Sequence, residues 1–252
     1  MKLHCIPILS ALFTSLVCFS NPATKISDNS PSSGIVIRWN DCEQTIDGFG
    51  IAQAGWAKEL FAFKNRKQVM DKMFGNDGLR LNILRGEIFP HYWENKEDKD
   101  FNLNDDINIE LCDSDFNNKS DDLLRRGQLW LTLEAKNKYH INKLVFSTWS
   151  APAWMKSNGK VSNGKLKPEC YQDFANYLAA FYKAYKSKGI TPYAISPSNE
   201  PGYAAPWNSS LWTADEMGKF ITSNLGPTFQ KENIPAKIIF GENPLWSVVM
   251  PQ

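Results

Sequence analysis

The chain has 252 residues, and 28 Lys and Arg against 27 Asp and Glu give it a formal net charge of +1. This near-balance, with no basic stripe along the sequence, argues against a nucleic-acid partner bound through bulk charge. The apolar fraction of 42% is that of a soluble domain able to bury a core. The nine Trp, eight Tyr and 15 Phe are typical either of a thick core or of a surface that stacks on sugars, and composition leaves both interpretations open.

The first 20 residues have the features of a secretory signal peptide. A short basic start precedes the mostly apolar run Ile6–Phe19, and small residues lie just before Asn21. The run is shorter than the roughly 20 residues that a membrane span requires, so a membrane anchor is the weaker interpretation. We predict a signal peptide over 1–20 and a flexible Pro- and Ser-rich linker over 21–33. The protein is then secreted, periplasmic or at the cell surface, with no integral membrane segment after signal removal.

Cysteine and histidine usage does not indicate a metal site. Cys42, Cys112 and Cys170 follow the signal peptide without a CxxC spacing, and they can form at most one disulfide with one thiol left free. No histidine belongs to an HExxH arrangement, and His91 and His140 are expected at the surface or in loops. We therefore expect no metal and no cofactor.

Strands and helices are predicted to alternate along the rest of the chain. The expected strands are 34–39, 45–50, 79–85, 143–149, 193–196 and 237–240, and the expected helices are 65–74, 123–138, 169–188 and 213–230. This alternation is typical of an α/β protein with a parallel sheet, and in particular of a (β/α)8 TIM barrel. About five strand–helix units follow Thr45, against the eight of a barrel. We interpret the sequence as a barrel truncated after about strand five.

A long acidic segment interrupts the alternation between 87 and 122. Its 36 residues include 12 acids, beginning with Glu87. A charge run of this kind usually forms a solvated loop, which is the favoured interpretation. Because the segment follows a strand, a loop that forms one wall of a binding groove is the alternative.

The triplet Asn199-Glu200-Pro201 comes shortly after the predicted strand 193–196. At the carboxyl end of a barrel strand, these positions project an amide and a carboxyl group into the same space. Glycoside hydrolysis needs an acid that protonates the departing sugar oxygen and a second carboxylate across the bond, and an amide can hydrogen-bond the sugar 2-hydroxyl. The alternative is a turn with an exposed glutamate, which the triplet taken alone favours.

Trp149 and Trp154 follow the strand before that one, on a loop that Pro152 makes rigid. Their flat faces suit stacking against a pyranose ring, and the alternative is that they plug the rim of the barrel. Arg85 ends the predicted strand 79–85. Its guanidinium either reaches site carboxylates and hydroxyls or forms a buried structural pair.

These segments together resemble glycoside hydrolase family 30, from about Ile37 to the end of the chain. The similar motifs are Thr45–Gly50 with Trp56, Ile83–Arg85, the loop Trp149–Lys156, and Tyr193–Pro201. The resemblance implies a (β/α)8 catalytic barrel that begins at 45 and continues to 252. It also implies a side β-sandwich, to which 34–44 contributes the first strand, and hydrolysis with retention of configuration.

The same resemblance implies roles for the candidate site residues. The matched positions are the catalytic acid/base Glu200 and the substrate-binding residues Asn199, Trp149 and Arg85, with Trp154 in the same loop as Trp149. The nucleophile of the family is a glutamate on the seventh strand, so Glu242, near the fifth strand, is implied to line the site instead. The nucleophile is then expected beyond the C-terminus, and the chain alone is expected to be inactive.

We predict a secreted retaining glycoside hydrolase that cleaves β-glycosidic bonds in a polysaccharide. The substrate is expected to be xylan-like, or a β-1,6-linked glucan or galactan. The alternative is a non-catalytic carbohydrate-binding barrel fragment, or the product of a decayed gene, in which aromatic side chains and Asn199 hold sugar without turnover.

Overall fold

The computed structural model describes residues 38, 40–41, 44–53, 56–97, 101 and 127–242. The chain divides into two compact units, Met1–Thr45 and Ile46–Gln252, and all the helices and strands given below belong to the second. The predicted signal peptide, the linker and the strand 34–39 lie outside the described residues, apart from Arg38. Most of the acidic segment 87–122 also lies outside them, because residues 98–126 are described only at Phe101.

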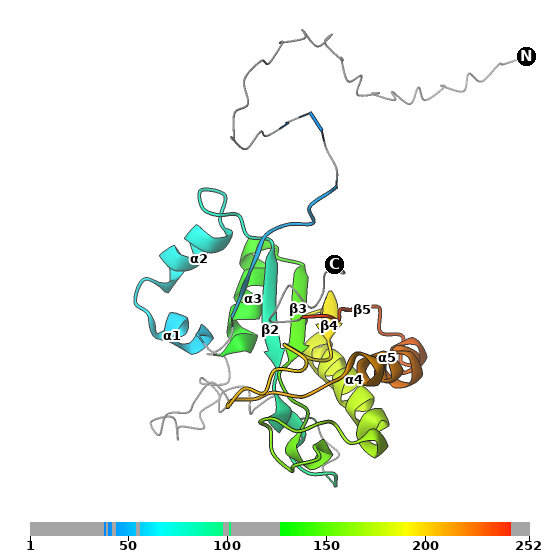
Figure 1. The fold of residues 1–252 in the computed structure, drawn as a ribbon. Helices are drawn as coiled ribbons and strands as arrows, with labels where there is room; N and C mark the ends of the chain where they lie inside the picture. Colours follow the sequence, from blue (N-terminus) through cyan, green and yellow to red (C-terminus); the bar gives the residue numbers. More distant parts are fainter. Residues whose placement is uncertain are drawn as a thin grey trace, which may run out of the picture. The chain divides into compact units, whose positions relative to one another are not determined.

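Five parallel strands form one sheet (Figure 1). They are β1 (Gly50–Ala52), β2 (Ile83–Ile88), β3 (Lys143–Thr148), β4 (Ala194–Ser196) and β5 (Lys237–Ile238). Each strand pairs with the next one along the chain, so the order across the sheet is β1-β2-β3-β4-β5. This sheet confirms the predicted α/β class and the strand–helix alternation.

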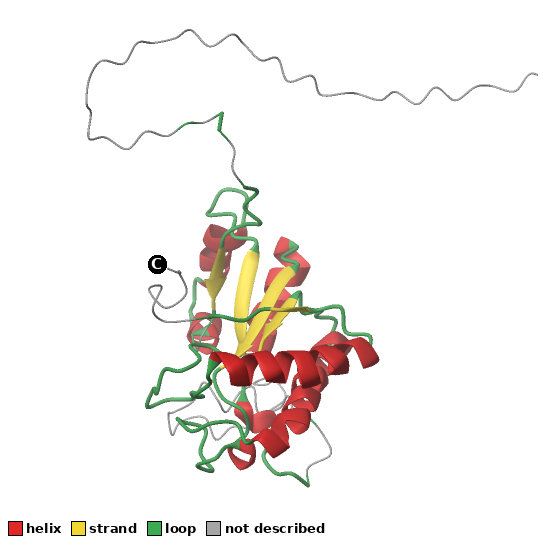
Figure 2. Cartoon of the chain, turned by 45° about the vertical axis from the view of Figure 1, so that its right-hand side comes forward, coloured by secondary structure: helices red, strands yellow, loops and turns green. Residues whose placement is uncertain are grey.

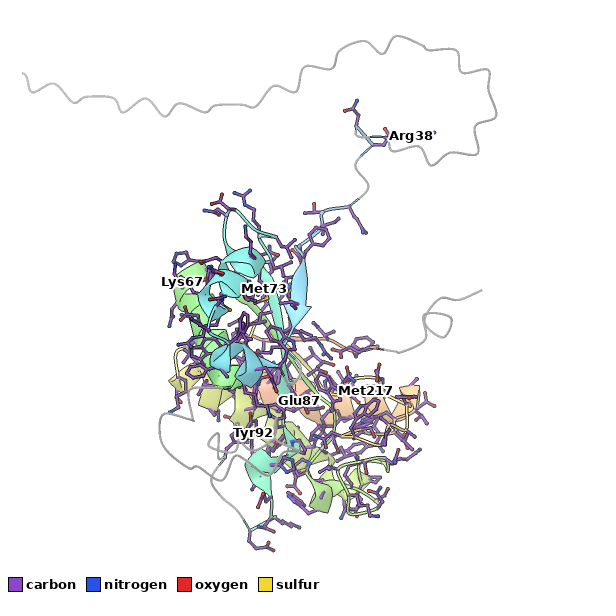
Figure 3. All side chains as sticks on the ribbon, turned by 90° about the vertical axis from the view of Figure 1, so that its left-hand side faces the viewer. Arg38, Lys67, Met73, Glu87, Tyr92 and Met217 are labelled. Atoms are coloured by element: carbon purple, nitrogen blue, oxygen red, sulfur yellow. The ribbon has the colours of Figure 1, made fainter. Side chains whose placement is uncertain are left out.

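Helices connect the strands, as parallel pairing requires (Figure 2). The α-helices are α1 (Ala57–Ala62), α2 (Arg66–Phe74), α3 (Gln128–Tyr139), α4 (Tyr171–Ser187), α5 (Ala214–Phe220) and α6 (Gly226–Lys231). The short 3-10 helices are η1 (Pro90–Trp93), η3 (Ala153–Met155) and η4 (Pro168–Cys170), and a π-helix, η5 (Ile221–Leu225), joins α5 to α6. The helix α2 turns Met73 toward the core and Lys67 outward (Figure 3).

The apolar core lies between the sheet and these helices. On β3, the ring of Phe146 packs edge-on against Phe181 and Tyr185 of α4, with centroids 5.0 and 4.9 Å away. The side chains of a strand alternate between its two faces, so Ser147 lies on the face turned away from α4. Parallel pairing in register keeps partners on one face, and Ser147 pairs with Glu87 of β2. This second face therefore carries Arg85, Glu87 and Ser147.

Gly86 marks a close contact between β2 and α3. A Cβ atom at this position would lie 2.5 Å from Oε1 of Gln128 and 2.8 Å from the ring of Phe146. The Gln128 side chain uses this space to accept from the backbone N–H of Glu87 and to donate to its carbonyl, at 2.6 and 2.7 Å. The Gln128 amide therefore supplies the hydrogen bonds that a neighbouring strand would make to Glu87, because the pairing of β1 with β2 ends at Arg85.

The strand boundaries differ from those predicted for the first two strands of the sheet. The first strand begins at Gly50 and not at Thr45, because Gly48 has a φ of +148° and the Asn82 side chain accepts from the N–H of Phe49. The second begins at Ile83 and not at 79, since Arg80 has a φ of +54°, outside the β region. It continues to Ile88, so Glu87 belongs to a strand and not to the acidic segment.

Two helical features were not anticipated. The helix α1 has no counterpart among the predicted elements. The predicted helix 213–230 forms, but its middle is the π-helix η5. Pro227 lacks the N–H that an α-helix needs at this point, and the N–H of Gly226 bonds to the carbonyl of Ile221 five residues back. Thr213 and Glu216 close its start in a capping box.

Candidate active site

The candidate site residues meet at the carboxyl edge of the sheet. Arg85 lies within β2, Trp149 follows β3, Asn199 and Glu200 follow β4, and Glu242 follows β5. Because all five strands are parallel, their carboxyl ends share one edge. In barrels built from βα units, this is the edge where active sites are found.

Arg85 joins three of these residues. Its Nη2 donates to Oδ1 of Asn199 at 2.7 Å and to Oε2 of Glu242 at 2.6 Å. The guanidinium carbon lies 4.5 Å from the centroid of the Trp149 ring, in a cation–π arrangement. The side chains of Arg85 and Glu242 are 24% and 19% exposed, so the pair is shielded from solvent without being sealed from it. These contacts fit both interpretations of Arg85, as a guanidinium that reaches candidate site residues and as one half of a largely buried structural pair.

Glu242 is held from two sides. Besides the Arg85 guanidinium, its Oε2 accepts from the hydroxyl of Ser147 at 3.1 Å. Ser147 belongs to no motif of its own, and period-2 alternation along β3 is the signal that places it on the polar face. A carboxylate with these two donors is oriented and neutralised, as suits a residue that lines a site.

Glu200 has an unusual backbone. Its φ is +44°, in the left-handed region that a residue with a side chain seldom adopts. The N–H of Asn199 bonds to the carbonyl of Thr148 at 2.6 Å, and the N–H of Tyr203 bonds to the carbonyl of Glu200 at 3.0 Å, which holds the turn. Such conformations cost of order 1–3 kcal/mol and cluster at active sites.

The carboxylate of Glu200 and the amide nitrogen of Asn199 are both available to a ligand. Within the described ranges, neither Glu200's carboxylate nor Nδ2 of Asn199 has a hydrogen-bond or ion-pair partner. Since Arg85 occupies Oδ1 of Asn199, the amide offers two N–H donors. A proton donor or acceptor and a fixed amide donor therefore belong to consecutive residues in the loop after β4.

Trp154 is packed against the protein. Its Nε1 donates to the carbonyl of Trp93 at 3.1 Å, and the two indole rings meet edge-on with centroids 6.0 Å apart. Trp93 in turn stacks on Tyr177 of α4. These contacts favour the interpretation of Trp154 as part of the rim, whereas Trp149 faces the Arg85 guanidinium.

No cluster of three or more His, Cys, Asp and Glu side chains that could hold a metal occurs in the described part of the chain. Cys170 is a buried free thiol, and burial raises its pKa. Cys42 and Cys112 lie outside the described residues. Within those same residues, none of the helices combines the length and hydropathy that a membrane-spanning helix needs.

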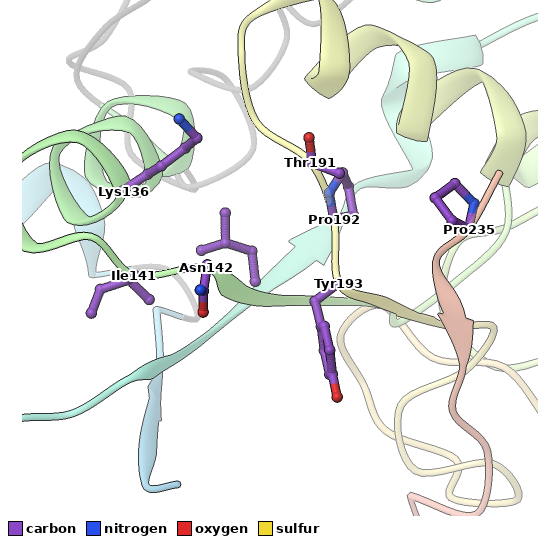
Figure 4. A pocket seen from close by; sticks show the side chains of 8 residues that line it. Lys136, Ile141, Asn142, Thr191, Pro192, Tyr193 and Pro235 are labelled. Carbon is purple, nitrogen blue, oxygen red and sulfur yellow. The ribbon is translucent and has the colours of Figure 1, made fainter. Parts of the chain in front are cut away.

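Two pockets lie away from the candidate site. One, of about 350 Å³, is lined by residues that precede β3, β4 and β5, including Asn142, Pro192 and Pro235 (Figure 4). It therefore opens at the amino ends of the strands, the edge opposite to Glu200. The other, of about 520 Å³, lies beside α2. Neither is lined by any of the residues that Arg85 joins.

A parallel βα sheet that carries polar and aromatic side chains toward its carboxyl edge has the arrangement in which βα barrels place their active sites. The sequence model of the glycosyl hydrolase family 30 TIM-barrel domain matches residues 46–240. The chain belongs to this family.

Relatives and solved structures agree with this assignment. The chain is 30% identical over 200 residues to the putative glucosylceramidase 3 of Caenorhabditis elegans, covering 75% of the chain and 37% of that protein. It is 28% identical over 237 residues to the endo-1,6-β-D-glucanase of Neurospora crassa, covering 87% and 45%. The catalytic domain of xylanase C from Talaromyces cellulolyticus is 25% identical, with a TM-score of 0.65 over 81% of this chain and 48% of that one. The chain thus spans less than half the length of each.

Proposed function

We propose that the protein is a retaining glycoside hydrolase in which Glu200 is the general acid/base. The observation that carries the proposal is the Glu200 carboxylate, which has no partner among the described residues and belongs to a left-handed backbone position next in the chain to the Asn199 amide fixed by Arg85. As acid, Glu200 gives its proton to the oxygen of the departing sugar, and as base it then takes a proton from the attacking water.

Asn199 supports the same step. With Oδ1 held by Arg85, its Nδ2 can donate to the 2-hydroxyl oxygen of the sugar that is cleaved. Hydrogen bonds to this hydroxyl strengthen in the oxocarbenium-like transition state. Trp149, whose ring is backed by the Arg85 guanidinium, offers a flat apolar surface to a sugar ring.

Glu242 is proposed to line the site and not to act as the nucleophile. The resemblance to glycoside hydrolase family 30 implies a nucleophile on the seventh strand, whereas Glu242 follows β5 and is held through Oε2 by Arg85 and Ser147. We therefore propose that the nucleophile is a glutamate from a strand later in the barrel than β5. On this proposal, the 252-residue chain alone has no glycosidase turnover.

The substrate is proposed to be a β-linked polysaccharide, either a β-1,6-glucan or a xylan. The similarity to a fungal endo-1,6-β-glucanase and to a xylanase supports this class. The test uses the full-length protein, by which we mean the chain together with the later barrel strands that the proposal requires. It is incubated with β-1,6-glucan, xylan and glucosylceramide, and reducing ends and product anomers are followed by proton NMR. Release of β-anomers from a polysaccharide is expected, whereas binding to it without any release would favour a non-catalytic carbohydrate-binding protein.

We also propose that the protein is exported. The apolar run Ile6–Phe19 and the small residues that precede Asn21 support a cleaved signal peptide. Expression with its own N-terminus should place the protein outside the cytoplasm, with a mature first residue at Asn21 by mass spectrometry. An intact Met1 on a cytoplasmic product would contradict export.

A further inference from the structure

Lys156 is a buried lysine between two loops of the candidate site. It follows η3 in the loop after β3, and only 2% of the residue is exposed. Its Nζ donates to Oγ of Ser150 at 3.0 Å, to the carbonyl of Ser209 at 2.7 Å and to Oγ of Ser210 at 2.9 Å. The three donors of the ammonium group thus have three oxygen partners.

These partners are all neutral. Within the described ranges, Lys156 forms no ion pair with a carboxylate. Burying an ammonium group without a counter-charge is unfavourable, and burial alone lowers the pKa of Lys156 from 10.5 to about 8. A site that only required filling would be served by an apolar side chain of similar volume. We therefore look for the role of the ammonium group in the two loops that its hydrogen bonds connect.

Each of the two loops that Lys156 joins carries part of the candidate site. Ser150 is the residue after Trp149, whereas Ser209 and Ser210 lie in the loop after β4 that begins with Asn199 and Glu200. The loops also meet through their backbones. The N–H of Ser209 bonds to the carbonyl of Val161 at 3.0 Å, and that of Leu211 bonds to the carbonyl of Gly164 at 2.9 Å.

We propose that Lys156 is a positioning residue that fixes the loop of Trp149 against the loop of Glu200. The inference rests on the proposed function, because the distance between the two loops determines how a sugar held on Trp149 lies relative to the acid. Lys156 itself has no role in bond breaking. Its loss is expected to displace the acid relative to the departing oxygen while the sheet and α4 stay folded.

The test compares Lys156→Met with Lys165→Met in the full-length protein. Lys165 is a matched control, since it lies in the same loop and reaches the later chain through an exposed pair with Glu216 at 2.8 Å. Rates are measured on the natural polysaccharide and on an aryl glycoside with an activated leaving group. Amide hydrogen exchange is followed at Ser209 and Leu211, with the amides of α4 as reference.

Lys156→Met is expected to lower the rates on both substrates unequally. The fold-loss on the polysaccharide should be at least ten times the fold-loss on the aryl glycoside, because the leaving group of the aryl glycoside needs little protonation. It should also speed exchange at Ser209 and Leu211 at least tenfold, with α4 unchanged. A loss of folded protein would instead lower both rates equally. Ser210→Ala removes one partner of the ammonium group and should change the rate ratio and the amide exchange in the same direction as Lys156→Met. It replaces Lys156→Met in the test if that variant does not fold.

Equal losses on the two substrates, or unchanged exchange at Ser209 and Leu211, would overturn the positioning role. So would the same effects in Lys165→Met. Absence of turnover by the unsubstituted full-length protein would overturn the proposed function. The exchange measurement does not depend on turnover, so the two failures are distinguishable.

Discussion

Arg85 and Glu242 are 157 positions apart in the chain, yet Nη2 of one lies 2.6 Å from Oε2 of the other. Arg85 belongs to β2 and Glu242 follows β5, and two strands separate them in the sheet. On a flat sheet with strands about 4.8 Å apart, three spacings would place them roughly 14 Å from each other. The long side chain of Arg85 and the segment after β5 together bridge this width, so the two charges meet on the polar face of the sheet.

Arg85→Lys tests the importance of this junction. A lysine has donors for Asn199 and Glu242, but it lacks the planar guanidinium that lies against the Trp149 ring while Nη2 makes both hydrogen bonds. We expect kcat/KM of the full-length protein to fall tenfold or more, about 1.4 kcal/mol of transition-state stabilisation. Arg66→Lys is the matched control, since Arg66 stacks on Phe61 at an exposed position of α2. Equal activity of the two variants would contradict the role of Arg85.

Trp149→Ala and Trp154→Ala should separate binding from stability. Trp149 contacts the Arg85 guanidinium, an interaction worth about 0.5–1 kcal/mol at a partly exposed site, so its loss should change Tm little. The substrate affinity of Trp149→Ala should fall tenfold or more, a loss of about 1.4 kcal/mol of binding free energy. Trp154 loses a hydrogen bond and its packing on Trp93, so its replacement should lower Tm. Thermal unfolding and glycan titration of both variants test this assignment. A lower Tm for Trp149→Ala together with weaker glycan binding by Trp154→Ala would contradict it.

Gly86→Ala should destabilise the fold. The new Cβ atom would lie 2.5 Å from Oε1 of Gln128, which bonds to the Glu87 backbone and cannot move without breaking that contact. Overpacking of this kind costs about 1–3 kcal/mol. Gly218→Ala on α5 is the control, because no atom lies within 4 Å of its would-be Cβ, and helix propensity predicts a gain of roughly 0.5–1 kcal/mol. Changes in the free energy of unfolding, relative to the native protein, that have the same sign in both variants would be inconsistent with this packing.

The burial of Lys156 predicts a pH dependence of stability. Its pKa is about 8 in the folded protein and 10.5 when unperturbed, so below pH 8 both folded and unfolded forms are protonated. Between pH 8 and 10.5 the unfolded form binds more protons, so the free energy of unfolding rises with pH. Relative to Lys156→Met, the native protein should gain about 3 kcal/mol across this interval and nothing below it. A difference that stays constant from pH 7 to pH 10 would show that Lys156 titrates normally.

The strand-end motifs could be predicted from the sequence because they are local. Asn199 and Glu200 follow one predicted strand, 193–196, and Trp149 ends another, 143–149, so alternation with helices is enough to place them at one edge. The extent of β2 could not be predicted, since Glu87 reads as the start of the acidic segment while the Gln128 side chain extends the sheet there.

The contacts between non-adjacent strands had no signal in the sequence. The pairing of Arg85 with Glu242 depends on how the segment after β5 returns over the sheet, which no periodicity encodes. Lys156 was not singled out because lysines are almost never fully buried unless paired, and its partners are neutral oxygens from a loop some 50 residues later. Both cases are long-range interactions that outweigh the local preference of the residue.

The most direct test of the account is Glu200→Gln in the full-length protein, with the exposed Glu169→Gln as control. The amide keeps the shape of the side chain but cannot donate the proton that a sugar leaving group needs. The rate on the polysaccharide should fall by about 10²–10⁴, with a much smaller loss of the bond-cleavage step on an aryl glycoside whose leaving group departs without protonation. The control should behave as the native protein. Equal losses on both substrates, or full activity of Glu200→Gln on the polysaccharide, would contradict the assignment of Glu200 as the acid/base.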